Sequence, residues 1–130
     1  MVHDVVSPQT GRRVVRLHCS GAFDHGGHLI RDYGAKALRE TRADTVLLDI
    51  MHLHYTWGDD LLLAFDIPFY ADEHRADLPL AVVVGPDCQP AVQTLLEQEA
   101  GFSDWRDATF VFTDEPSALE WLCRDATSNA

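Results

Sequence analysis

The chain has 130 residues, of which 46% are hydrophobic, and 21 acidic against 10 basic residues give it a formal net charge of −11. This length predicts a single compact domain with a substantial core, and the negative charge argues against nucleic acid and anionic membranes as partners. The three cysteines, Cys19, Cys88 and Cys123, are widely spaced without a C-x-x-C pair, so we expect buried reduced thiols and a cytoplasmic location. No apolar run approaches the roughly 20 residues that span a bilayer, and we expect no membrane insertion.

A β-hairpin and a helix are predicted for the N-terminal part of the chain. Segments 2–6 and 12–20 have strand-like composition and flank a turn, 7–11, that contains Pro and Gly. In the second strand apolar residues alternate with mixed ones, which predicts one apolar face. Asp24 is placed to cap a helix over 27–41. We expect the inner face of this helix to consist of Leu29, Ile30, Tyr33, Ala37 and Leu38.

The most apolar stretch, 45–50, predicts a strand that is buried on both faces in the middle of the sheet. The short link before it favours a right-handed crossover and parallel pairing with the preceding strand. Residues 56–59 fit a capping box, so a helix is predicted to begin there, and Pro68 is expected to kink or split it. The apolar residues at helical spacing in this helix are Leu61, Leu62, Phe65 and Phe69.

The C-terminal half predicts two further strands and two further helices. Segment 80–84 is a second fully buried strand and should lie beside the first. Asp87 is predicted to cap a helix that has Pro90 in its first turn and ends at Gly101. The last strand is expected over 109–112, followed by a helix over 116–124 with Thr113 or Asp114 as its cap and then by a polar tail, 125–130. The inner residues of the two helices are Val92, Leu95, Leu96 and Ala100, then Ala118, Leu119 and Leu122.

The turn after the central strand is the first place to look for a binding surface. In open α/β sheets, the carboxyl ends of strands and the N-termini of the following helices expose residues that are free from core packing. We therefore predict an interaction surface, the acidic rim, formed by Asp24, Thr56, Trp57, Gly58, Asp59 and Asp60. A structural role also accounts for Asp59 and Asp60, because carboxylates in a first helical turn interact favourably with the helix dipole.

Histidines are the other candidate site residues. His52 and His54 share one face of a strand, a spacing that can bind a metal, and His25 and His28 lie near the start of the first helix. The side chains of His25, His28, His52 and Asp59 could converge on one ion. Histidines that line a solvated rim give the same pattern. We expect no tight transition-metal site and no cofactor. No catalytic triad, P-loop or dinucleotide-binding pattern has its required context, so we expect no enzymatic activity.

The motifs in 16–25, 46–55 and 112–119 resemble, in this order, the second strand, the central strand and the closing strand and helix of STAS domains. These are the bacterial anti-sigma-factor antagonists and the related cytoplasmic domains of sulfate transporters. The resemblance implies one α/β domain over 1–124, with a mixed, mostly parallel sheet, an N-terminal hairpin and about four helices. It also implies a regulatory protein-interaction module whose protein partner is an anti-sigma factor or a kinase-like protein.

The chain departs from this family at the central turn. Where antagonists have Asp-Ser-Ser-Gly with a phosphorylated serine, the aligned residues are Trp57, Gly58, Asp59 and Asp60, so the acceptor hydroxyl is missing. The two carboxylates could imitate a permanently phosphorylated state. A second hypothesis is a small-molecule or lipid carrier related to Sec14-like proteins, with a pocket under 61–70. A third hypothesis is a metal-binding protein that uses the rim histidines, which are His25, His28, His52 and His54.

Overall fold

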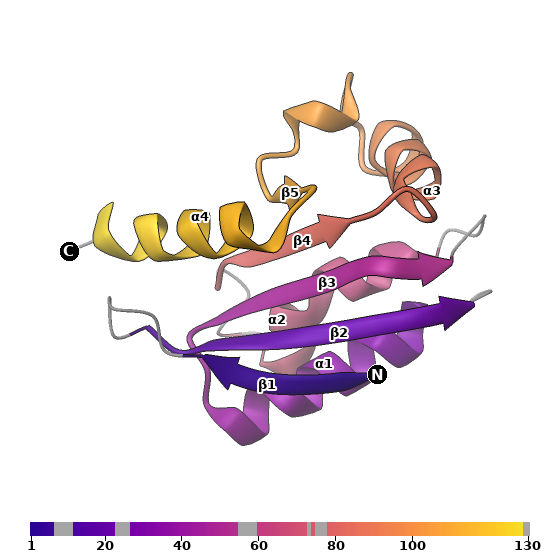
Figure 1. Ribbon diagram of the computed structural model, residues 1–130. Helices are drawn as coiled ribbons and strands as arrows, with labels where there is room; N and C mark the ends of the chain where they lie inside the picture. Colours follow the sequence, from indigo (N-terminus) through magenta and orange to yellow (C-terminus); the bar gives the residue numbers. More distant parts are fainter. Residues whose placement is uncertain (7–11, 23–26, 55–59, 73, 75–77, 129–130) are drawn as a thin grey trace.

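The computed structural model describes the chain except for residues 7–11, 23–26, 55–59, 73, 75–77 and 129–130. Its centre is a five-stranded sheet in the order β1-β2-β3-β4-β5, in which β1 and β2 are antiparallel and the other neighbours are parallel (Figure 1). The strands are β1 (Val2–Val6), β2 (Val14–Ala22), β3 (Thr45–His54), β4 (Leu80–Val84) and β5 (Val111–Phe112). The predicted hairpin, the central position of β3 and its parallel pairing are confirmed. The last strand is shorter than predicted.

In the described part of the chain, four α-helices and three longer helical segments of other types lie between or after the strands. They are α1 (Gly27–Thr41), η1 (Asp60–Asp66), α2 (Ile67–Ala71), α3 (Gln89–Thr94), η3 (Leu95–Glu99), η4 (Trp105–Asp107) and α4 (Glu115–Ser128). Segments η1 and η4 are 3₁₀-helices and η3 is a π-helix. Helix α4 continues beyond the predicted end at 124 and includes residues 125–128 of the expected polar tail. Among the described helices, none combines the length and the apolar character needed to cross a bilayer.

The sheet has two unequal cores. On one face, helices α1 and α2 cover the sheet, and α3 also packs on this side through Val92 (Figure 1). The buried strand residues of this face include Val15, Leu17, Cys19, Val46, Leu48, Ile50, Val82 and Val84. On the other face, α4 packs its Ala118 and Leu122 against Leu47 and Val83. Among the described helices, α4 alone contributes buried residues to this second core, so part of the α4 face of the sheet is left for polar side chains.

The predicted inner face of α1 is wrong at Leu29, whose surface is 49% exposed. The buried face runs through Ile30, Gly34, Ala37 and Leu38, a spacing of three to four residues. Leu29 lies one position from this stripe and is therefore rotated by about 100° from it.

The predicted split at Pro68 is confirmed, because this residue lies in the first turn of α2, directly after η1. The buried residues Leu61, Ala64 and Ile67 recur every three positions, which is the period of a 3₁₀-helix. The α-helical spacing that placed Phe69 inside is therefore wrong, and Phe69 is 49% exposed.

Two of the predicted helix termini can be compared with the structure at atomic detail. Asp114 accepts a hydrogen bond from the Ser117 amide at 2.8 Å and caps α4, as predicted. Asp87 does not cap α3: the N-cap position belongs to Cys88, and no side chain caps that helix. The amides of Cys88 and Gln89 donate to the Gly85 carbonyl instead, so a backbone turn leads into the helix.

Candidate functional site

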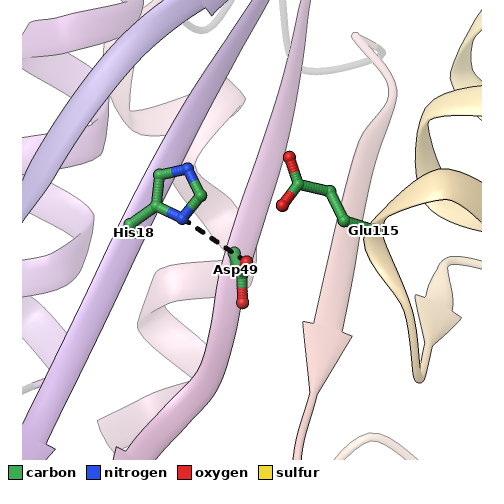
Figure 2. Close-up of side chains that lie close together, drawn as sticks. All are labelled: His18, Asp49 and Glu115. Atoms are coloured by element: carbon green, nitrogen blue, oxygen red, sulfur yellow. Dashed lines mark ion pairs between the residues drawn. The ribbon is translucent and has the colours of Figure 1, made fainter.

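Polar side chains gather on the α4 face of β1, β2 and β3. Residues paired across neighbouring strands point to the same face, and here Asp4 is paired with Arg16, and His18 with Asp49. Glu115, the first residue of α4, lies against the same strands and completes the group. Figure 2 shows His18, Asp49 and Glu115 approaching one another from β2, β3 and the start of α4.

Arg16 links the edge strand to α4. Its Nε donates to Asp4 Oδ1 at 2.8 Å, its Nη2 contacts the other oxygen of Asp4, and its Nη1 donates to Glu115 Oε1 at 2.8 Å. The hydrogen bond from the Arg16 guanidinium lowers the pKa of Asp4, and the two carboxylates together raise the pKa of Arg16. The hydrogen bond from Arg16 also sets the position of the Glu115 carboxylate.

His18 and Asp49 form the inner part of the site. The Nδ1 atom of His18 lies 3.4 Å from Asp49 Oδ2, and Asp49 Oδ1 accepts a hydrogen bond from the Met51 amide at 2.9 Å. One oxygen of Asp49 is thus held by the backbone of its own strand, while the other faces the imidazole. The Met51 amide therefore fixes the direction of a carboxylate that directly follows the apolar residues 46–48 of β3.

A β-bulge follows directly after Asp49. The pairing steps from His18–Asp49 to Ser20–His52, so β3 has one residue more than β2 at this point. The bulge carbonyl of Ile50 accepts a hydrogen bond from the Cys88 thiol at 3.2 Å. A Cβ on Gly85 would lie 2.0 Å from the Met51 carbonyl oxygen, so only glycine allows the end of β4 to approach the bulge.

The bulge determines which way the histidines of β3 face. Leu53 is fully buried while His52 and His54 are exposed, which confirms the predicted one-face arrangement of the two imidazoles. His54 Nε2 lies 3.8 Å from Asp87 Oδ1, at the same end of the sheet. The predicted convergence with His25 and Asp59 falls outside the described residues. The group of possible ligands that the described part of the chain brings together is His18, Asp49 and Glu115 instead.

Most residues of the predicted acidic rim fall outside the described part of the chain. Asp24, Thr56, Trp57, Gly58 and Asp59 fall outside the described residues, and Asp60 is the first residue of η1. The strand ends that precede these segments are described: Ala22 and His54 are paired neighbours at the ends of β2 and β3.

Sequence reasoning missed the role of His18, Asp49 and Glu115. Two signals in the sequence point to them. Asp49 interrupts the most apolar stretch of the chain, and His18 and Arg16 occupy the mixed face of β2. The contribution of Glu115 has no local signal, because it depends on how α4 lies across the sheet.

The segment predicted to cover a ligand pocket packs closely on α1. A Cβ added at Gly34 would lie 2.5 Å from Ile67 Cδ1 and 2.9 Å from Leu17 Cδ1. Leu61, Ala64 and Ile67 have no exposed surface. These contacts give the carrier hypothesis no support at this position.

No model of a protein family matches the chain, and no curated protein sequence matches it. The chain is similar to solved structures, including two of SpoIIAA. The anti-sigma factor antagonist SpoIIAA in its unphosphorylated form is 13% identical with a TM-score of 0.57, covering 93% of this chain and 96% of that one. The Bacillus cell fate determinant SpoIIAA in the phosphorylated form is 14% identical with a TM-score of 0.52, covering 93% and 99%. At these identities the similarity concerns the architecture, and the chain has the STAS fold of SpoIIAA, as its motifs predicted.

Proposed function

We propose that the chain is a regulatory module that binds a protein partner and catalyses no reaction. The observation that supports this is the similarity, over 93% of the chain, to a protein described as an anti-sigma factor antagonist. The partner class that follows is an anti-sigma factor, including the kinase-like kind. The strongly acidic chain, with a net charge of −11, fits a partner that presents a basic surface.

We place the contact at the acidic rim formed by Asp24, Thr56, Trp57, Gly58, Asp59 and Asp60. The pairing of Ala22 with His54 supports this placement, since the segments that contain Asp24 and Thr56 leave the sheet from adjacent strand ends. Both segments therefore follow the carboxyl-terminal ends of strands, where open α/β sheets bind their ligands.

The proposed contact differs from that of an antagonist with a phosphorylatable serine. Gly58 and Asp59 stand at the two serine positions of the family motif, so the rim carries fixed carboxylates and no acceptor hydroxyl at that point. Incubation with an antagonist-type kinase should therefore add no phosphate to residues 56–60, as measured by intact-mass and peptide mass spectrometry. Stoichiometric phosphothreonine at Thr56 would show that a phosphorylation switch survives.

The binding test compares two double variants of equal charge change. Asp59→Lys/Asp60→Lys alters the rim, whereas Glu40→Lys/Asp72→Lys alters the opposite end of the sheet, where Arg39 contacts the Ala71 carbonyl at 3.4 Å. Each variant is titrated calorimetrically with a histidine-kinase-like anti-sigma factor from the same genome. The rim variant should lose at least about tenfold in affinity, and the control variant should stay close to the wild type.

Circular dichroism distinguishes a loss of binding from a loss of folding. The rim variant should lose only about 1 kcal/mol of stability, because its lysines no longer cap the helix or interact favourably with the helix dipole. If the folded rim variant bound a true partner unchanged, the contact would lie elsewhere on the protein. If the wild-type chain bound no anti-sigma factor of its organism, the proposed function would be wrong.

A further inference from the structure

His18, Asp49 and Glu115 each offer one ligand atom, and these atoms all lie within 4.8 Å of one another. They come from three separate elements, β2, β3 and α4, and none belongs to the acidic rim (Figure 2). We propose that these three side chains bind a divalent transition-metal ion. This site is independent of the partner contact proposed above.

The distances are close to those of a coordination sphere. Ligand atoms that surround a zinc ion tetrahedrally at about 2.1 Å are roughly 3.4 Å apart. The Nδ1 atom of His18 and Oδ2 of Asp49 are 3.4 Å apart, so this pair already has the required spacing. Glu115 begins α4, and its carboxylate points toward the pair, with a ligand atom within 4.8 Å of those of His18 and Asp49.

Both carboxylates are oriented by contacts that leave a second oxygen for the ion. Asp49 Oδ1 is held by the Met51 amide at 2.9 Å, and Glu115 Oε1 is held by Arg16 at 2.8 Å. Hydrogen bonds of this kind around metal ligands fix their direction and strengthen binding. The β-bulge supplies the Met51 amide, so an irregularity of the central strand takes part in forming the site.

The charge of the cluster also favours a cation. Asp4, Asp49 and Glu115 carry three negative charges against the single positive charge of Arg16, and His18 is neutral as a ligand. A divalent ion brings this sum to zero. The side chain of His18 is 37% exposed, which gives the ion access from solvent.

The ligand types indicate which ions bind. One imidazole nitrogen and two carboxylate oxygens suit zinc, cobalt, manganese or iron, with water completing the sphere, and they disfavour calcium, which prefers six to eight oxygens. Zn²⁺ for affinity and Co²⁺ for its visible absorption spectrum are therefore the probes.

The experiment titrates the full chain, in a Cys123→Ser background, with Zn²⁺ by calorimetry and with Co²⁺ by absorption. We expect one ion per chain with micromolar affinity and a higher thermal midpoint in its presence, because the ion joins β2, β3 and α4. His18→Ala and Glu115→Gln should each weaken binding by about tenfold or more. The glutamine retains an oxygen that accepts from Arg16, so this variant should fold.

His52→Ala and His54→Ala are the matched controls, because each removes an exposed imidazole from the carboxyl-terminal end of β3, outside the proposed site. They should leave the affinity unchanged. Absence of binding at millimolar Zn²⁺, equal binding by His18→Ala and the wild type, or loss of binding in the control variants would each overturn the proposal. The last result would move the ion to the rim histidines.

Discussion

Gly85→Ala tests the close approach between the end of β4 and the bulge in β3. The new methyl carbon would lie 2.0 Å from the Met51 carbonyl oxygen, 2.8 Å from its carbon and 3.0 Å from its Cα. All three are backbone atoms, so no side-chain rotation relieves the contact. A normal carbon–oxygen separation of about 3.3 Å requires the strands to move apart by roughly 1.3 Å.

The magnitude follows from what such a movement breaks. Inserting a methyl group into a packed site costs about 1–3 kcal/mol, and the shift also disturbs the Asp49–Met51 hydrogen bond, which is worth about 1 kcal/mol or more. We therefore expect a loss of about 2–4 kcal/mol in the free energy of unfolding. At about 2.1 cal/mol/K of unfolding entropy per residue, a chain of 130 residues should melt about 7–15 °C lower.

Urea and thermal unfolding followed by circular dichroism measure this loss, with Gly34→Ala as the matched control. A Cβ at Gly34 would meet Ile67 Cδ1 at 2.5 Å, but that atom is the end of a flexible side chain. Alanine also favours the α1 helix by about 1 kcal/mol, so the control should lose less than half as much stability. If Gly85→Ala stayed within about 1 kcal/mol of the wild type, or was the milder variant, the close approach and the bulge geometry would be refuted.

Three further predictions concern single groups. The Thr45 hydroxyl is buried without a hydrogen-bond partner among the described residues, so Thr45→Val should raise the free energy of unfolding by about 1 kcal/mol; a loss in urea titrations would reveal a bond to that hydroxyl. Burial raises the pKa of Cys19 to about 11 and also raises the pKa of Cys88, so iodoacetamide at pH 8 should modify Cys123 first in the native protein, as peptide mass spectrometry would show. Rapid modification of either buried thiol would contradict this. Hydrogen bonds from Ser117 lower the pKa of Asp114 below 3.8, so its stabilising effect is present above that pH and is lost on acidification. Asp114→Ala should therefore melt lower than the wild type at pH 7, with a difference that shrinks below about pH 3.8; a constant difference would show that the charge has no part in it.

Most of the fold was predictable because its signals are local. The apolar runs of β3 and β4, the two strands of the hairpin and the Asp114 cap can each be recognised from a few neighbouring residues. Gly101, with φ of 84°, follows the helical region that it was predicted to end.

The errors arose where the backbone departs from the regular periodicity of an α-helix or a β-strand. In η1 the 3₁₀ period of three replaced the expected period of about four, so Ala64 is buried, and Phe69, which was expected inside, is exposed in α2. The candidate metal site required knowledge of register and of the path of α4, because His18, Asp49 and Glu115 are far apart in the sequence. Pattern reasoning could identify Asp49 as unusual but could not find its neighbours.

The extra residue in β3 also affects how this chain is compared with others. Before the bulge, even-numbered positions such as Ile50 face the larger core, and after it the odd-numbered Leu53 does so while His52 and His54 face solvent. Deleting Met51 would place Leu53 two positions after Ile50, so a regular strand without the bulge would keep Leu53 in the core and both imidazoles facing solvent. An alignment to any protein whose corresponding strand lacks the bulge therefore needs a one-residue gap inside the central strand. Without that gap, every position after Met51, including positions 56–60 of the acidic rim, is aligned with the wrong residue of the other protein.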